Sequence, residues 1–357
     1  MNNNIESELF SLLETVIKNK ASDLHLGDDQ QPTLRLHGAL VPIQGTKKLD
    51  SEKAKNLAFS LLNQEQKEKF LKNKEIDLSY NYKNKARFRV NIYFQKGSVS
   101  AALRLIPTKI KTTEELNLPP IVKEFAKPSQ GFVLITGPAG HGKTTVMASI
   151  IDIINRTRND HIITIEDPIE YIFEQDKCII DQREVRQDTK TFQTALRSMF
   201  RQDANVVMIG EMRDPETISA AVTAAETGHL IFATLHTNTA AQTIDRIIDS
   251  FEAHQQSQIR AQLANALLGI ISRRLIPTKS GELISAAEVL IVNNAIRNLI
   301  RENKIHQIDL VIETSSDMGM VSLNKSLAEL VQKNIVDPEI AETYSTNPQE
   351  LKTLLSQ

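Results

Sequence analysis

Several features that define particular classes of protein are scarce or missing in this sequence. It has one cysteine in 357 residues, Cys178, so neither an internal disulfide nor a multi-cysteine zinc site can form within one chain. Tryptophan is absent and aromatic residues account for 5%, which disfavours a surface that stacks nucleic-acid bases. Glycine (13 residues) and proline (12) are too rare for a collagen-like or low-complexity chain. The composition is otherwise that of a globular protein, and at about 150 residues per domain the length predicts two domains.

Signals for membrane insertion and export are also missing. No apolar run approaches the roughly 18 residues that a transmembrane helix needs. The opening residues, MNNNIESELF, lack the charged and then apolar pattern of an export signal. Together with the single thiol, these observations predict a cytoplasmic protein whose membrane contact is peripheral.

The net charge of −2 lacks the strongly basic balance of a nucleic-acid binder. The charge is unevenly distributed, however. The first 110 residues contain 18 Lys and Arg and 12 Asp and Glu, a net charge of +6, whereas the rest contains 24 and 32, a net charge of −8. Opposite charges could attract the two parts to each other within a chain or between neighbouring subunits, or they could belong to two unrelated solvated surfaces.

The pattern divides the chain into residues 1–106, a linker at 107–120, and residues 121–357. The first part combines a helix at 4–20 with short strands and predicts a small α+β domain. Its predicted strand at 86–95 alternates basic and apolar residues, which places the arginines on one face. The linker is polar, is bounded by prolines and has no periodicity.

The second part alternates apolar strands with helices, which predicts an α/β domain with a parallel sheet covered on both faces. The predicted strands are 132–136, 161–165, 205–209 and 230–235. A helix at 215–227 is expected between Asp214 as N-cap and Gly228 just beyond its end. From about residue 252 onward the pattern predicts mostly helix.

The strongest motif fits G-x-x-x-x-G-K-S/T between the apolar strand FVLIT and a helix-forming run. It comprises Gly137, Pro138, Ala139, Gly140, His141, Gly142, Lys143 and Thr144, and is followed by Thr145. The glycines let backbone N–H groups turn toward phosphates, Lys143 bridges the β- and γ-phosphates, and the Thr144 hydroxyl ligates Mg²⁺. The motif therefore predicts that ATP and Mg²⁺ bind here.

Hydrolysis also needs an acid near the metal and a group that orients water. Glu211 follows the apolar strand VVMIG and is expected at the edge of the sheet beside the P-loop, where it would reach Mg²⁺ partly through water. Glu166, Asp167 and Glu170 follow the strand HIITI in the same way, although Asp-Pro sequences also occur in ordinary turns.

Two histidines, His229 and His236, bracket the strand LIFATL. Each could be an ordinary structural hydrogen-bonding residue. His236 is at the end of the strand that should face the nucleotide and is the better catalytic candidate.

These four segments, in this order, resemble the type II/IV secretion and pilus ATPases. The resemblance assigns a Walker A loop, an Asp box (ITIEDPIEY), a Walker B segment (VVMIGEMRD) and a His box (ETGHLIFATLHTNTAAQTIDRI). The segments ASDLHL and ARFRVN are similar to the PAS-like amino-terminal domain of that family. The fold implied is a RecA-like P-loop NTPase domain preceded by a PAS-like α+β domain.

The resemblance also implies roles for single residues. Glu170 becomes the water-activating glutamate, Glu211 the Walker B acid, and both histidines lie near the γ-phosphate. Arg89 and Arg104 match basic residues that the amino-terminal domain offers to nucleotide, within a subunit or from a neighbour. An alternative is that these arginines are ordinary surface residues of a sheet. The family loop GPTGSGKS is changed here at three positions, Ala139, His141 and Thr144, and His141 introduces a group that titrates near neutral pH.

The segment AIRNLIRE resembles a motif of the twitching-motility pilus retraction ATPases. Its residues Ala295, Arg297 and Arg301 are expected to face a partner, although the segment also fits a simple amphipathic helix. Assembly ATPases of the family usually carry a four-cysteine zinc module. The single cysteine and the short amino-terminal region therefore favour retraction.

The resemblance implies an ATPase that forms a homo-oligomeric ring, a hexamer, and that works on the cytoplasmic side of the inner membrane. Its expected partners are a pilus platform protein and a second retraction ATPase, with no nucleic acid. The alternatives are a pilus assembly or type II secretion ATPase, a DNA-acting RecA-like ATPase, and a non-hydrolysing nucleotide-sensing scaffold.

Overall fold

The computed structural model describes residues 2–36, 38–83, 85–107 and 109–356. Contacts divide the chain into two compact units. Unit 1 comprises Met1–Lys109 and Glu170–Ile172, and unit 2 comprises Ile110–Ile169 and Phe173–Gln357. Each unit has its own sheet and its own hydrophobic core.

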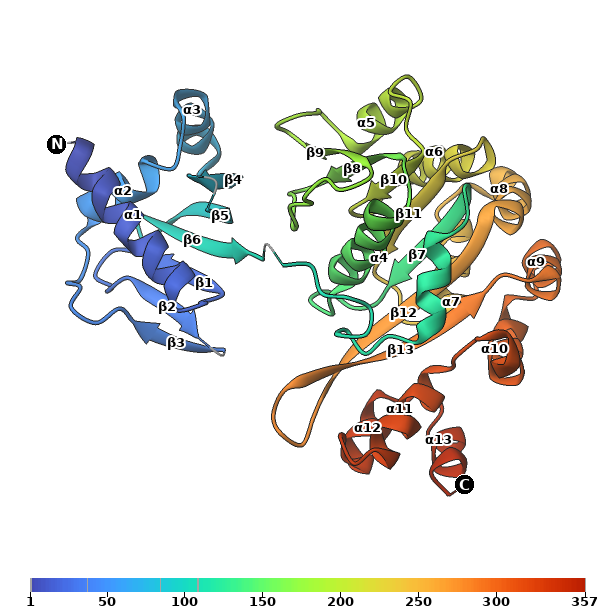
Figure 1. Cartoon of the computed structure of the whole chain (residues 1–357). Helices are drawn as coiled ribbons and strands as arrows, with labels where there is room; N and C mark the ends of the chain where they lie inside the picture. The colour runs from blue at the N-terminus through green and yellow to red at the C-terminus, as the bar shows by residue number, and fades with distance from the viewer. Residues whose placement is uncertain (1, 37, 84, 108, 357) are drawn as a thin grey trace. The chain divides into compact units, whose positions relative to one another are not determined.

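Unit 1 is a six-stranded antiparallel sheet with three helices (Figure 1). Its elements are α1 (Asn2–Lys18), β1 (Asp23–Leu26), β2 (Thr33–Leu36), β3 (Ala39–Pro42), α2 (Ser51–Phe59), α3 (Gln64–Asn73), β4 (Glu75–Tyr82), β5 (Ala86–Gln95) and β6 (Ser98–Ile106). The strand order is β3-β2-β1-β6-β5-β4. The alternating pattern of β5 places Phe88 and Val90 in the core, whereas Arg87 and Arg89 lie on the other face, as predicted.

Unit 2 contains a seven-stranded sheet of order β13-β12-β7-β11-β10-β8-β9 (Figure 1). Its strands are β7 (Gly131–Thr136), β8 (His161–Glu166), β9 (Ile179–Glu184), β10 (Val206–Ile209), β11 (Leu230–Leu235), β12 (Leu267–Pro277) and β13 (Leu283–Ile291). Strand β12 runs parallel to β7, and β13 is antiparallel to β12. The α/β class with a mostly parallel sheet is confirmed.

The helices of unit 2 account for most of the remaining chain. They are η1 (Pro120–Ala126), α4 (Lys143–Thr157), α5 (Phe192–Met199), α6 (Pro215–Glu226), α7 (Ala240–Asp249), α8 (Ala253–Ala266), α9 (Asn294–Arg301), η2 (Ile305–Gln307), α10 (Ile308–Thr314), η3 (Ser316–Met318), α11 (Leu323–Gln332), α12 (Pro338–Tyr344) and α13 (Pro348–Leu355). Helix α6 has the predicted ends, because Asp214 caps the N–H of Thr217 and Gly228 has a positive φ of 113°.

The prediction of a mostly helical segment after residue 252 missed two long strands, β12 and β13. The sequence of β12, LLGIISRRLIP, contains Ser272, Arg273 and Arg274, and these polar residues interrupt the apolar run that marks a buried strand. The structure shows why these polar residues are tolerated: each makes hydrogen bonds within unit 2.

Helices cover both faces of the unit 2 sheet. Alternate strand residues such as Phe132 and Leu134 pack in one core with α5 to α9. The residues of α4 are absent from that core, and α4 contacts β7, β11 and η1 instead. Since β7, β11, β10 and β8 are parallel, their carboxyl ends reach the same edge of the sheet.

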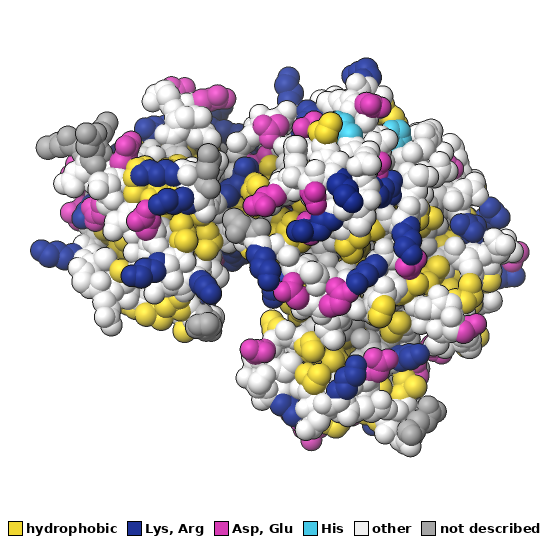
Figure 2. All heavy atoms as spheres, viewed as in Figure 1, with side chains coloured by type: hydrophobic (Ala, Val, Ile, Leu, Met, Phe, Trp, Pro, Cys, Tyr) yellow, Lys and Arg dark blue, Asp and Glu magenta, His cyan; other side chains and the backbone are white. Residues whose placement is uncertain are grey.

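Charged side chains are distributed over both units. Figure 2 shows acidic and basic groups interspersed on the face that it presents. Among the described helices, none has the length and apolar character that a membrane span requires. Between β6 and η1, residues 107 and 109–119 form neither helix nor strand, and position 108 lies outside the described residues.

Candidate nucleotide-binding and catalytic site

The carboxyl edge of the unit 2 sheet brings three of the four sequence motifs together. Strand β7 ends at Thr136, whose register partner on β11 is Leu235, and the P-loop and His236 follow directly. Directly after β10, the N–H of Gly210 donates to the carbonyl of Ile165, which fixes the start of the Glu211 segment beside the end of β8. Segments distant in sequence therefore emerge side by side from adjacent strands.

The P-loop has the backbone conformation that its glycines predict. Gly137, Gly140 and Gly142 have φ values of 143°, 77° and 71°, which favour glycine. A Cβ atom on Gly137 would lie 2.3 Å from the carbonyl oxygen of Arg273, so a side chain cannot fit there. Lys143 is buried, and its Nζ atom donates to the carbonyls of Gly137 (2.9 Å) and Pro138 (3.0 Å).

Strand β12 supports the P-loop from outside. The guanidinium of Arg273 donates through one terminal nitrogen to the carbonyl of Gly142 (2.8 Å) and through Nε to the Ser285 hydroxyl (2.9 Å). The backbone N–H of Leu275 donates to Nδ1 of His141 (3.0 Å). Burial and the nearby cations, Arg274 first among them, lower the pKa of His141.

Glu211, His236 and Lys143 form a contiguous polar group. The His236 Nδ1 atom lies 3.2 Å from the Lys143 ammonium, and its Nε2 atom lies 3.7 Å from a carboxylate oxygen of Glu211. The other oxygen of Glu211 pairs with Arg213 at 2.6 Å. Because an ammonium only donates, Nδ1 accepts and the neutral ring carries its proton on Nε2, facing Glu211.

The acids after β8 differ in position. Glu166 is 1% exposed and accepts a hydrogen bond of 2.7 Å from Thr164, so it is held inside the unit. Asp167 pairs with Arg186 at 3.2 Å. Glu170 is exposed and belongs to the segment grouped with unit 1.

Within one chain, the two candidate histidines lie at opposite edges of the sheet, and only His236 is beside the P-loop. His229 precedes β11, whose first residue pairs with Gly131 at the opposite edge of the sheet from the P-loop. Six extended residues separate the two edges by about 20 Å. The ring of His229 instead packs edge-on against Phe200, and its Nδ1 atom lies 3.1 Å from the carbonyl of Ala224.

The two candidate arginines are neighbours in unit 1. Arg89 on β5 and Arg104 on β6 are register partners, so their side chains share one face. Arg104 pairs with Asp23 at 2.9 Å, while its side chain remains 67% exposed. The two arginines therefore present a paired basic surface on the sheet.

Helix α9 carries the AIRNLIRE segment and is amphipathic, as the sequence predicts. Ile296 and Ile300 are fully buried, whereas Ala295 and Arg301 are exposed and Arg297 is half-buried. Arg301 donates to the side chain of Asn265 on α8 at 2.6 Å.

Sequence reasoning missed three polar residues next to this site, namely Ser272, Arg273 and Glu288. All three are buried in the sheet. Burial raises the pKa of Glu288 to about 7. The nearby Asp309 adds to this rise, whereas the backbone N–H of Ala240, the Ser272 hydroxyl and the charge of Arg274 each lower the pKa and offset part of it. The available signal was a charged residue inside an apolar strand pattern, which marks a buried group with a specific partner.

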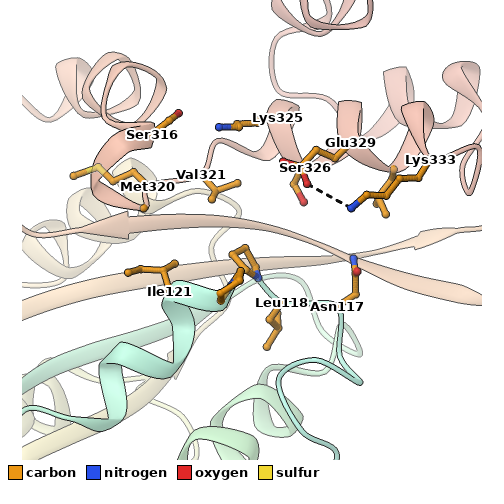
Figure 3. A pocket seen from close by; sticks show the side chains of 14 residues that line it. Asn117, Leu118, Ile121, Ser316, Met320, Val321, Lys325, Ser326, Glu329 and Lys333 are labelled. Atoms are coloured by element: carbon orange, nitrogen blue, oxygen red, sulfur yellow. Dashed lines mark ion pairs between the residues drawn. The ribbon is translucent and has the colours of Figure 1, made fainter.

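A separate cavity of about 380 Å³ lies between residues 117–121 and the segment from η3 to α11 (Figure 3). Its lining combines apolar side chains such as Ile121 and Val321 with an ion pair of 3.9 Å between Lys333 and Glu329. It contains none of the residues that the sequence assigns to the site.

Known families and structures resemble this chain over most of its length. The family described as type II/IV secretion system protein matches residues 2–347. The type IV pilus retraction ATPase PilT of Pseudomonas aeruginosa is 41% identical over 342 residues, 96% of this chain and 99% of that protein. The twitching motility protein of Neisseria gonorrhoeae is 43% identical over 321 residues, 90% of this chain and 86% of that protein.

The similarity extends to three-dimensional structure. The crystal structure of the pilus retraction motor PilT with bound ADP matches this fold with a TM-score of 0.90 and 43% identity. The match covers 96% of this chain and 98% of that one.

Proposed function

The chain belongs to the type II/IV secretion system protein family, and we propose that it is a Mg²⁺-dependent ATPase motor that powers type IV pilus retraction. The observation that carries the proposal is the convergence of Lys143, Glu211 and His236 at one edge of the sheet. A P-loop by itself supports only nucleotide binding. The acid and the histidine beside its lysine add groups that hydrolysis needs.

Binding of ATP follows from the P-loop geometry. Its left-handed glycines and the start of α4 turn backbone N–H groups toward the phosphates. The Lys143 ammonium donates to two neutral loop carbonyls. The β- and γ-phosphate oxygens of ATP are charged and accept more strongly, so the ammonium turns to them when ATP binds.

The residues at this edge fit Mg²⁺, which prefers oxygen ligands and retains several waters. Thr144 lies in the first turn of α4, and Glu211, whose side chain is 17% exposed, follows two residues after the end of β10. These two groups would hold the ion, Glu211 partly through water. When bound, the ion neutralises charge on the β- and γ-phosphates.

Further groups complete the proposed reaction. Glu211 and His236 hold the polar network next to the γ-phosphate, and Glu170 orients the attacking water. Arg89 and Arg104 reach the phosphates of a nucleotide bound by a neighbouring copy. A guanidinium suits this task because it binds the spread negative charge of the transferring phosphoryl group.

As a motor, the protein is proposed to assemble into a homo-hexameric ring on the cytoplasmic side of the inner membrane. The ring would act on a pilus platform protein, with a second retraction ATPase as a further partner and no nucleic acid. Helix α9 offers this contact through the exposed parts of Ala295, Arg297 and Arg301.

Deletion of the gene tests the direction of the motor. If the protein powers retraction, the deletion strain should carry excess surface pili and lose surface motility. The wild-type gene should reverse both changes, and a gene with Lys143→Ala should not. Cells without pili would instead assign the protein to assembly. ATP turnover by the purified protein, unchanged by single-stranded DNA, separates this proposal from a DNA-acting ATPase.

A further inference from the structure

Three buried polar side chains form a row across the face of the unit 2 sheet that α7 covers. Thr136 on β7 pairs in register with Ser272 on β12, and Ser272 pairs with Glu288 on β13. Their exposed fractions are 0%, 2% and 6%. Neighbouring positions on the same face, such as Leu134 and Ile270, are fully buried and apolar. Polar groups in such surroundings are costly unless they are hydrogen-bonded.

The three side chains form a chain of neighbours from β7 to β13. The Thr136 hydroxyl donates to the oxygen of Ser272 at 2.9 Å. Ser272 and Glu288 are register partners on adjacent strands, and the Ser272 hydroxyl acts as a donor that lowers the pKa of the Glu288 carboxyl. Glu288 Oε1 also accepts the backbone N–H of Ala240 at 2.7 Å. The carboxylate therefore receives donors from both sides, a role that only an acceptor group can fill.

The two ends of this chain are next to the two halves of the candidate site. Thr136 immediately precedes Gly137, the first residue of the P-loop. Ala240 is the first residue of α7, four positions after His236. The first N–H groups of a helix have no partner within the helix, so the Glu288 carboxylate both satisfies one of them and interacts favourably with the helix dipole.

We propose that Glu288 is a positioning residue for ATP hydrolysis: through Ala240 on one side and Ser272 and Thr136 on the other, it holds the His236 loop in fixed register with the P-loop. This inference rests on the proposed ATPase function and adds a residue to it. It explains why an acid is kept inside an apolar strand, where its burial is unfavourable.

The position of Glu288 indicates whether nucleotide binding or catalytic turnover should be impaired when Glu288 is replaced. The P-loop backbone that binds phosphates is also supported by Arg273 and by the bond between His141 and Leu275. Nucleotide binding should therefore survive. The placement of His236 against Lys143 depends on the start of α7, so the loss should appear in kcat.

The test compares steady-state ATP hydrolysis by the full-length wild type and three variants. Glu288→Gln keeps the shape but replaces one acceptor oxygen with a donor, Ser272→Ala interrupts the row, and Thr136→Val removes its first hydroxyl at constant shape. We expect kcat to fall about tenfold in Glu288→Gln and Ser272→Ala, with KM for ATP changed less than about twofold. In the Glu288→Gln, Thr136→Val double variant, kcat should fall by less than the product of the two fold-losses measured in the single variants, because both residues act through one row of side chains.

Ser149→Ala is the matched control. Ser149 is 2% exposed on α4, and its hydroxyl has no hydrogen-bond partner within the described part of the chain. Its loss should leave kcat unchanged. Thermal unfolding and binding of a fluorescent ADP analogue confirm that each variant folds and retains its nucleotide site.

Three outcomes would overturn the proposal: an unchanged kcat in Glu288→Gln, a rise in KM that accounts for the whole loss, or strictly multiplicative effects in the double variant. An inactive wild type would contradict the proposed function instead. The two failures are therefore distinguishable.

Discussion

The Nδ1 atom of His141 accepts a hydrogen bond of 3.0 Å from the backbone N–H of Leu275, so a side chain of the P-loop is fastened to the neighbouring strand β12. Protonation of Nδ1 would remove this acceptor. Burial, together with Arg274 and Lys143, lowers the pKa of His141 below its ordinary value of 6.5. The bond is therefore fully present above about pH 6.5 and is lost as the pH falls through the lowered pKa.

We expect nucleotide affinity in the wild type to decline as the pH falls below 6.5 through the lowered pKa of His141. The decline should be smaller in a His141→Ser variant, because serine does not titrate in this range. The measurement is the Kd of a fluorescent ADP analogue between pH 5 and pH 8. His254→Ser, which changes an exposed histidine paired with Glu252, should keep the wild-type profile. If the affinities of the wild type and of His141→Ser depend on pH in the same way, His141 does not cause the pH dependence of nucleotide binding.

Arg273 offers a second test of the support from β12. In Arg273→Met the carbonyl of Gly142 loses a charged donor at 2.8 Å, and the P-loop loses a contact that fixes the start of α4. We expect ATP to bind about tenfold more weakly, in line with the loss of a charge-assisted hydrogen bond. The matched control is Arg274→Met, since that guanidinium donates to the carbonyl of Tyr344 instead. Equal losses in both variants would contradict a specific role for Arg273.

Lys143 and Glu211 should separate binding from chemistry. Lys143→Ala removes the cation that contacts the phosphates, and we expect both ATP binding and turnover to be lost. Glu211→Gln keeps the shape but removes the charge, and we expect kcat to fall at least about a hundredfold while ATP still binds. Glu216→Gln, an exposed acid in the first turn of α6, serves as the control. Undiminished turnover in Lys143→Ala would end the ATPase assignment.

Whether a functional residue can be predicted from the sequence depends on whether it acts through its local motif. Lys143, Glu211 and His236 are predictable because each follows an apolar strand, and parallel strands deliver such residues to one edge. The same rule favours His236 over His229, since a strand has two ends and only one of them meets the P-loop. A motif that contains both histidines does not by itself make that distinction.

Residues that act through strand pairing cannot be predicted in this way. Ser272 and Glu288 meet Thr136 only because β12 and β13 join the sheet in a particular register. Nothing local fixes that register, and the polar residues of β12 conceal the strand itself. The positioning network therefore becomes visible only in three dimensions.

The uneven charge of the chain predicts a salt effect on assembly. If the net charge of +6 in the first 110 residues attracts the net charge of −8 in the rest between neighbouring copies, salt should weaken the ring. Salt screens exposed charges beyond a distance of about 10 Å at 0.1 M. Sedimentation velocity between roughly 0.05 and 0.5 M NaCl, a range that includes this concentration, should therefore show a shift toward smaller species as salt rises. A distribution independent of salt would leave the charge asymmetry without a role in assembly.

Glu288 makes a prediction about stability that does not depend on ATP. Burial raises its pKa from the ordinary value of 4.5 to about 7, with Asp309 adding to the rise and Arg274 opposing it. The folded state thus holds the proton more tightly than the unfolded state, so the stabilisation is complete below about pH 4.5 and is lost as the pH rises through 7. Glutamine does not titrate. The stability of the wild type relative to Glu288→Gln should therefore fall between pH 5 and pH 8, by on the order of 3 kcal/mol.

Urea unfolding of both proteins at several pH values measures this difference directly. Taking the difference cancels the titration of every other group that the two proteins share. Glu282→Gln, an exposed acid in the turn between β12 and β13, should track the wild type at all pH values. A constant difference between the wild type and Glu288→Gln would mean that Glu288 titrates as it does in the unfolded chain. The carboxylate would then not experience the desolvation that its place in the row between Ser272 and Ala240 imposes.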